Sequence, residues 1–209
     1  MRNDWRGTEA VATWLASSAR AEAAAATAFA STVTDLHALD APSELVDRAG
    51  RTLDEALRRA RILRSLAIRR GGRPQPTVSE IRGRDRLGFA VENGVRGCVR
   101  EGWTALVAHW QALHAADREI AAVFARIAVD AARHAELSAD IDRWLQPQLG
   151  PRDRIAVANA RRAAVDALGD GVEPDPDLHR IAGLPSASTT RRLLRALAAE
   201  GRDAGARAA

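Results

Sequence analysis

Three ionisable side chains interrupt stripes that otherwise look like the inner faces of helices, and two of the three are capable of acid–base or metal chemistry. Heptad steps through residues 15–36 pass along small and apolar side chains and reach Glu22 at the middle. The same steps through residues 92–113 place Arg96 at the depth of a core position, and those through residues 120–145 place His134 among isoleucines. A carboxylate, a guanidinium and an imidazole that meet in a core can pair with one another, and the carboxylate and imidazole can also bind a metal.

A fourth segment is ambiguous. Glu55, Arg58 and Arg59 share a helical face with Ile62 and Leu66, and this face fits either a core or a boundary position.

The elements that would carry these residues are all helices, because alanine is frequent and no stretch alternates over several residues. The expected helices cover about 8–39, 43–70, 87–115 and 117–145, followed by weaker ones at about 152–168 and 187–200. Short links inside each pair and a longer link at 71–86 are typical of an up-down four-helix bundle with one long crossover. We therefore predict an N-terminal tail at 1–7, a bundle at 8–146 and a C-terminal helical extension at 147–209, with a loop at GDGVEPDPD and GLPS.

The amino-acid composition limits the classes of function that this chain can have. Arginine supplies all 31 basic residues of the 209, yet the formal net charge is only +4 and acidic residues are interleaved with basic ones, so we do not expect nucleic-acid binding. The lone Cys98 excludes an internal disulfide and a cysteine-based zinc cluster. No apolar run of about 18 residues is present. We expect a cytoplasmic protein without a membrane partner.

Four segments resemble a known family when they are taken in order. RAEAAAATAFA, TLDEALRRA, ENGVRGCVREGW and VDAARHAEL are similar to segments of the ferritin-like proteins of GC-rich bacteria, which read approximately EHASVAAFA, DExxHA, EGCVRET and DExRHA. The resemblance covers about residues 9–144, and AGLPSAS near the C-terminus also looks like the tail of that family. It implies a ferritin-like four-helix bundle and, as the original activity, metal-dependent oxidation.

The resemblance also implies a set of metal ligands. In dimetal bundles two helices each supply one glutamate and the other two each supply Glu-x-x-His. When this ligand set is placed on the present chain, Glu22, Glu55 and His134 are the ligands that remain. Arg58 stands in place of a histidine, and Arg96 and Ala131 each stand in place of a glutamate. The resemblance therefore implies a degenerate site that has lost three of six ligands.

Arginine cannot replace a metal ligand, because it stays protonated and has no lone pair to donate. Glu22, Glu55, Arg58 and Arg96, with a neutral His134, nevertheless sum to zero charge without any metal. We hypothesise that the two guanidinium groups take the electrostatic place of the two cations. The prediction is a metal-free core ion-pair cluster in which Glu22 and Glu55 contact Arg58 or Arg96.

Three functions follow as alternatives. The first is a non-catalytic protein without a cofactor, a binding or assembly component with an unnamed protein partner or a second copy of itself. The second is a dimetal or mononuclear oxidase or iron-handling protein that holds iron or manganese with Glu22, Glu55, Glu92 and His134. The third is the binding of a small organic ligand between the helices, where Arg58 or Arg96 would hold its anionic group.

Nearby acidic residues bear on the second alternative. Asp130 would reach such a site only after a helix rotation of about 100°. Glu101 and Glu136 are expected at the surface.

Overall fold

The computed structural model describes residues 9–76, 83–169 and 171–206, and in these ranges every regular element is a helix. The expected tail at 1–7 and part of the expected crossover lie outside the described residues. The elements are α1 (Glu9–Ala38), α2 (Ser43–Arg69), α3 (Arg86–Glu92), the π-helix η1 (Asn93–Glu101), α4 (Gly102–His114), α5 (Arg118–Leu145), the short 3-10 helix η2 (Gln146–Gln148), α6 (Pro151–Asp166), α7 (Pro176–Ala182) and α8 (Ala187–Ala206).

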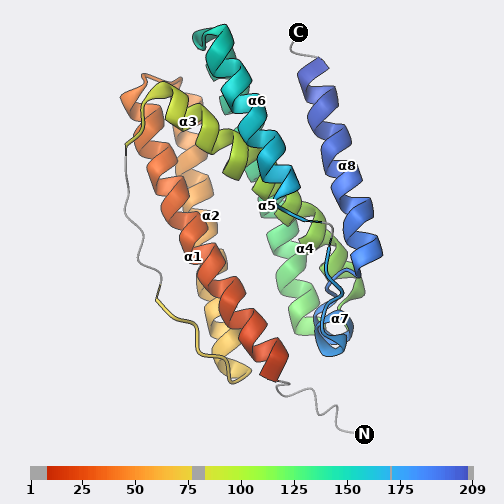
Figure 1. The fold of residues 1–209 in the computed structure, drawn as a ribbon. Helices are drawn as coiled ribbons and strands as arrows, with labels where there is room; N and C mark the ends of the chain where they lie inside the picture. The colour runs from red at the N-terminus through yellow and green to blue at the C-terminus, as the bar shows by residue number, and fades with distance from the viewer. Residues whose placement is uncertain (1–8, 77–82, 170, 207–209) are drawn as a thin grey trace, which may run out of the picture.

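Two antiparallel helix pairs make up most of the molecule (Figure 1). The first pair is α1 with α2, joined at a tight turn in which Asp40 adopts a left-handed conformation with φ of 52°. The second pair is α5 with one continuous rod formed by α3, η1 and α4, which we call the third rod. Asp117 begins α5 by accepting hydrogen bonds from the backbone N–H groups of Glu119 and Ile120, as an N-cap aspartate should.

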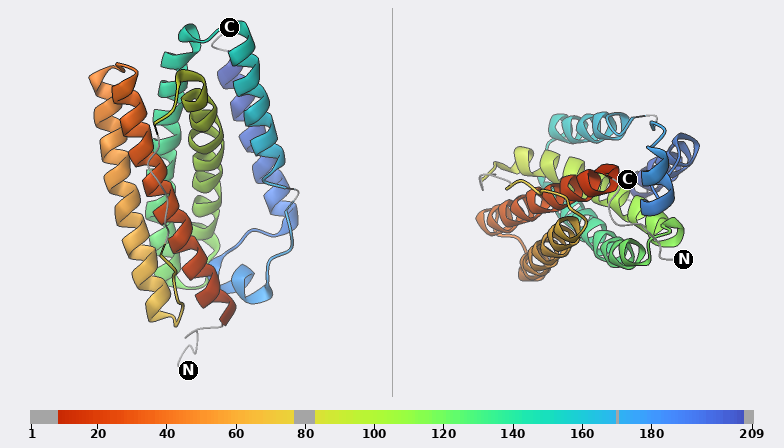
Figure 2. Two further views of the ribbon diagram at one scale, coloured as in Figure 1. Left: turned by 60° about the vertical axis from the view of Figure 1, so that its left-hand side comes forward. Right: turned by 90° about the horizontal axis from the view of Figure 1, so that it is seen from below.

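The link between the pairs is long because α2 ends at one end of the molecule and α3 begins at the other (Figures 1 and 2). At the start of α3, Asp85 caps the helix by accepting a hydrogen bond from Gly88 N–H at 2.8 Å. The bounds of α2 and α5 agree with the sequence prediction to within one residue.

The core is divided along the helix axes. One apolar cluster lies near the start of α1 and α5 and includes Leu15, Leu66 and Phe124. A second lies near the opposite ends of these helices and includes Phe89 and Leu145. Side chains of this size contribute about 1.5–3 kcal/mol each when they are fully buried. Between them lies a small apolar cluster of Ala26, Phe29 and Ala56, together with buried polar residues that include Arg59 and His134.

The C-terminal part packs on the outside of the third rod. Helix α6 lies against α3 and η1, and α8 contacts α4, where Leu197 approaches Gly102 (Figure 1). Helix α7, which we did not predict, closes one end of the molecule: Gln111 donates a hydrogen bond to the carbonyl of Ala182 at 2.9 Å, and Ile181 joins the first apolar cluster.

Within the described ranges, none of the helices has both the length and the apolar character that crossing a membrane requires.

Candidate functional site: a charge cluster in the core

Five ionisable side chains from the two helix pairs meet between the apolar clusters. They are Glu22 of α1, Glu55 and Arg59 of α2, Glu101 of η1 and His134 of α5. We call this set the core cluster. Each of the four long helical segments supplies at least one member, so the cluster connects both pairs at mid-height.

Arg59 is the cation at the centre of the core cluster. Its side chain is only 2% exposed, and its Nε lies 2.9 Å from Glu22 Oε2 while its Nη2 lies 3.6 Å from Glu101 Oε2. Among the described residues none of its three nitrogens makes a well-directed hydrogen bond. The guanidinium is therefore held by charge attraction to two carboxylates rather than by a bidentate hydrogen-bonded pair. Its three buried nitrogens can form hydrogen bonds after small rearrangements of the neighbouring side chains.

His134 lies between the third carboxylate, Glu55, and Glu101, which it shares with Arg59. It is fully buried, its Nε2 lies 3.0 Å from Glu55 Oε2, and its Nδ1 lies 3.3 Å from Glu101 Oε2. The ring meets Phe29 edge-on at a centroid distance of 5.0 Å. This contact and the two carboxylates fix the orientation of the imidazole.

Both ring nitrogens of His134 face carboxylate oxygens. A neutral imidazole has one N–H donor and one lone pair, so it donates to one of these oxygens, whereas an imidazolium donates to both. In either form the ring connects Glu55 of α2 with Glu101 of η1.

The core cluster is connected to the surface through Arg133. This half-exposed arginine donates a hydrogen bond to Glu55 Oε1 at 2.8 Å and another to Asp130 at 2.5 Å. From Glu22 through Arg59, Glu101, His134, Glu55 and Arg133 to Asp130, acidic and basic groups alternate. Such alternation lowers the cost of burying each charge because every member has an opposite neighbour.

Burial dominates the electrostatics of Glu22. Loss of solvation raises the pKa of this carboxyl above its ordinary value of 4.5, the charge of Arg59 opposes the rise, and the charge of Glu101 adds to it. Burial therefore favours the protonated form of the Glu22 carboxyl.

The π-helix explains why Glu101 reaches the core. Its hydrogen bonds span five residues instead of four, so each residue turns the helix by less than in an α-helix. Residues four apart therefore share a face, and Asn93, Gly97 and Glu101 are all buried.

A close approach to α5 holds this register. A Cβ on Gly97 would lie 2.2 Å from Ser138 Oγ, and Asn93 donates a hydrogen bond to the carbonyl of Ser138 at 2.9 Å. Ser138 in turn bonds to the carbonyl of His134. The contact between η1 and α5 thus lies directly beside the two members of the core cluster that these helices carry.

The structure corrects the predicted roles of the two arginines. Arg58 is exposed on α2. Arg96 is 46% exposed, and its Nε pairs with Glu92 at 2.7 Å, one turn away on the same rod. Neither guanidinium enters the core, because the inner face of α2 passes through Arg59 and the π-helix turns Arg96 outward. One buried arginine occupies the place that we predicted for two.

The other predicted site residues divide into two groups. Glu22, Glu55 and His134 come together in the core cluster. Glu92 does not join them, since its partners are Arg96 and Arg84, and Asp130 contributes only at the rim through Arg133. Glu101, expected at the surface, is instead a buried member. The predicted combination of Glu22, Glu55, Glu92 and His134 is therefore not assembled.

The core cluster was tested as a metal site through the directions of its donor atoms. Both nitrogens of His134 are directed at carboxylates, and Arg59 lies between Glu22 and Glu101. Across the described part of the chain, no three or more His, Cys, Asp or Glu side chains are arranged to hold a metal ion. The residues as arranged do not fit the dimetal centre that the ferritin-like resemblance implies.

Comparison of the chain with models of protein families, with curated proteins and with solved structures gives no match. The function is therefore argued from the geometry of the core cluster and the surfaces around it.

Proposed function

We propose that this chain is a ferritin-like four-helix bundle whose core is closed by an arginine instead of metals, and that it acts as a binding or assembly protein rather than an oxidase. The bundle would consist of α1, α2, the third rod and α5, with the long crossover between α2 and α3. The observation that carries the proposal is the position of Arg59, a fixed cation between carboxylates contributed by α1 and η1.

Carboxylates gathered in a bundle core repel one another unless cations lie among them, and metal ions serve that purpose in dimetal bundles. Arg59 provides a permanent positive charge at the same kind of position. The core cluster then carries its own cation, and it has no open coordination position at which oxygen or substrate could react.

The first test is metal content. Protein expressed in medium supplemented with iron and manganese should contain no metal above background when it is analysed by mass spectrometry, and the Glu22→Ala and His134→Ala variants should behave in the same way. One or two metals per chain, lost in both variants, would overturn the proposal and restore the oxidase.

The second test removes the arginine. In Arg59→Gln the three carboxylates and His134 keep their helices but lose the fixed cation, so the variant should gain affinity for a divalent ion. Titration with Co²⁺, followed by visible absorption and by the shift in Tm, should show saturable binding for Arg59→Gln and none for the parent protein.

Arg58→Gln is the matched control, since it removes an exposed arginine from the adjacent position of the same helix. Equal Co²⁺ binding by Arg58→Gln and Arg59→Gln would contradict the assignment of Arg59 as the replacement cation.

A further inference from the structure

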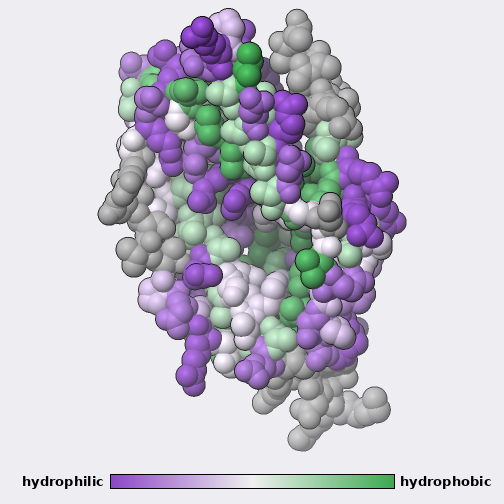
Figure 3. Space-filling model, viewed as in Figure 1, coloured by the Kyte–Doolittle hydropathy of each residue, from purple (hydrophilic) through white to green (hydrophobic). Residues whose placement is uncertain are grey.

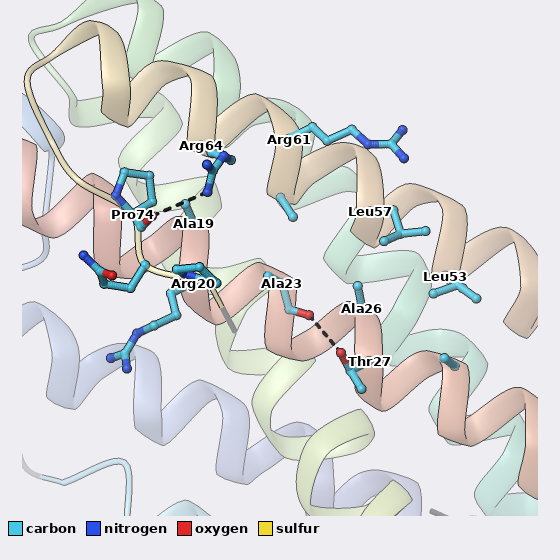
Figure 4. A pocket seen from close by; sticks show the side chains of 14 residues that line it. Ala19, Arg20, Ala23, Ala26, Thr27, Leu53, Leu57, Arg61, Arg64 and Pro74 are labelled. Carbon is cyan, nitrogen blue, oxygen red and sulfur yellow. Dashed lines mark hydrogen bonds between the residues drawn. The ribbon is translucent and has the colours of Figure 1, made fainter. Parts of the chain in front are cut away.

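A second feature, separate from the core cluster, is an apolar groove on the outer side of the first helix pair. It lies between α1 and α2, is bounded on a third side by Pro74–Pro76, and has a cavity volume of about 510 Å³ (Figure 4). This volume falls within the range of small-molecule sites in proteins. We refer to it as the outer groove.

Small side chains form the floor of the outer groove. Four of the six lining residues on α1 are alanines that recur at steps of four and three: Ala19, Ala23, Ala26 and Ala30. The other two are Arg20 and Thr27. On α2 the side is formed by Leu53, Leu57 and Ala60, and Leu57 is 38% exposed although it is a large apolar residue. The alanines create the depth of the groove, and the leucines give it an apolar side that remains open to solvent (Figure 4).

The described residues that line the outer groove carry charges of one sign. Within the described ranges, its charged lining residues are Arg20, Arg61 and Arg64, and no aspartate or glutamate lines it. Arg61 is exposed, and Arg64 donates a long hydrogen bond of 3.4 Å to the carbonyl of Pro74, so both guanidinium groups have further N–H donors for a ligand. An apolar floor beside arginines is complementary to a molecule with an apolar body and an anionic head.

The size of the cavity decides which kind of molecule fits. A three-turn helix is roughly 10 Å across and 16 Å long, and its volume is more than twice that of the outer groove. A methylene group takes about the volume of a water molecule, roughly 30 Å³, so the cavity has room for a chain on the order of 12 to 16 carbons. The dimensions favour a single alkyl chain over a helical segment of a partner protein.

We propose that the outer groove binds a single-chain carboxylate amphiphile, with the alkyl chain along the alanine floor and the carboxylate paired with Arg61 and Arg64. This inference rests on the proposed function in one respect, that a non-catalytic binding protein requires a ligand. It does not depend on the protonation of the core cluster. Metal found in the core would defeat the proposed function and leave the outer groove intact.

The experiment is calorimetric titration of the full-length, chelator-treated protein with dodecanoate below its micelle concentration. Dodecyltrimethylammonium, with the same chain and the opposite head charge, is the matched ligand. We expect one dodecanoate per chain and at least tenfold weaker binding of the cationic amphiphile. Affinity should also rise about fourfold for each methylene added from decanoate to dodecanoate, because each group leaves water for an apolar surface.

Variants locate the site. Arg61→Ala combined with Arg64→Ala should weaken dodecanoate about tenfold or more without weakening the cationic ligand, whereas Ala23→Leu should reduce both because it fills the floor. Arg126→Ala, an exposed arginine of α5, is the control and should change neither. Circular dichroism and Tm establish that each variant is folded.

Three results would each overturn the proposal: no saturable binding of dodecanoate, equal binding of the two head groups, or binding that the Ala23→Leu and Arg61/Arg64 variants leave unchanged. Saturable binding of an acidic helical peptide in place of dodecanoate would also overturn it, and would assign the outer groove to a protein partner.

Discussion

Two ion networks join α2 to α5, and their surroundings differ. The core cluster lies between apolar layers, where the side chain of Arg59 is 2% exposed and that of Glu22 is 12% exposed. The second network, which we call the end network, pairs Arg69 and Arg70 with Asp117 and Glu119 near the end of α2. Its outer pair is exposed, with Arg69 at 55% and Glu119 at 45%, whereas Arg70 and Asp117 beneath it are 14% and 9% exposed.

The pKa shifts of the acidic residues run in opposite directions in the two networks. In the core cluster, burial raises the pKa of Glu22 in spite of Arg59. In the end network, burial also acts to raise the pKa values of Asp117 and Glu119, but hydrogen bonds from Arg70, and for Glu119 also from Arg69, lower both below their ordinary range. Arginine–carboxylate pairs therefore stabilise the ionised carboxylate in the end network. In the core cluster the same kind of pair only partly offsets the cost of burying the ionised carboxylate of Glu22.

The strongest way to sharpen this comparison is to remove one arginine from each network. Arg59→Leu leaves Glu22 and Glu101 buried without a cation and should lower the free energy of unfolding by about 3–5 kcal/mol. Arg69→Ala should lower it by at most about 1 kcal/mol, because its partner remains solvated. Chemical denaturation measures both, and similar losses in the two variants would show that burial does not separate the networks.

The next largest effect concerns the contact that positions the core cluster. Gly97→Ala places a methyl group 2.6 Å from Ser138 Cβ, so η1 and α5 must separate, and we expect a loss of about 1–3 kcal/mol. Gly50→Ala is the matched control in α2, where nothing lies within 4 Å of the added Cβ. It should be neutral or stabilise by up to about 1 kcal/mol, owing to the better helix propensity of alanine. Equal outcomes at both glycines would refute the close packing.

The pH dependence of stability should separate the networks without any mutation. Because the folded-state pKa of Glu22 is raised above 4.5, folding favours its protonated form, and its contribution improves as pH falls toward 4.5. Asp117 and Glu119 have lowered pKa values, so their stabilising contribution is complete above their ordinary values of 3.8 and 4.5 and is lost as pH falls below them.

Unfolding curves for the parent and Glu22→Gln at several pH values between 3 and 8 would check these signs. In the variant, the free energy of unfolding should no longer increase as pH falls toward 4.5. It should still decrease as pH falls further, because Asp117 and Glu119 are unchanged. A Glu22→Gln protein whose slope above pH 4.5 matches that of the parent would contradict the raised pKa.

Raising the salt concentration should give the smallest difference between the two networks. The Arg69–Glu119 pair is exposed, so 0.5 M NaCl should reduce the already small effect of Arg69→Ala, whereas the effect of Arg59→Leu should hardly change. Denaturation of the three proteins at low and high salt makes the measurement. A strong salt dependence of the Arg59→Leu effect would indicate that water reaches the core cluster.

Much of the arrangement can be read from regular α-helical periodicity. The stripe predicted for α5, which contains His134, is buried at every position. On α2 the buried residues Leu45, Ala49, Thr52, Ala56, Arg59, Leu63 and Leu66 follow strict steps of four and three. This pattern was present in the sequence and identifies Arg59 rather than Arg58 as the inner arginine. The prediction that Arg58 enters the core follows from the resemblance to ferritin-like proteins and not from the helix period.

Glu101 could not be found in the same way. Heptad counting through the third rod assigns an inner position to Arg96 and an outer one to Glu101, and both assignments fail because the rod is not α-helical there. A π-helix is stabilised by its neighbours, here by Asn93 and Gly97 against Ser138, and these contacts join residues more than 40 positions apart. Local sequence does not contain that information.

The π-helical segment makes helix geometry a determinant of the charge in the core. If the segment adopted the ordinary helical period at its present length, Glu101 would turn away from the face of Asn93 and Gly97, and α4 beyond it would turn relative to α3. Arg59 would then face Glu22 alone, although every charged residue was still present in the sequence. In this protein a local change of helix type can therefore act as a charge mutation at a distance.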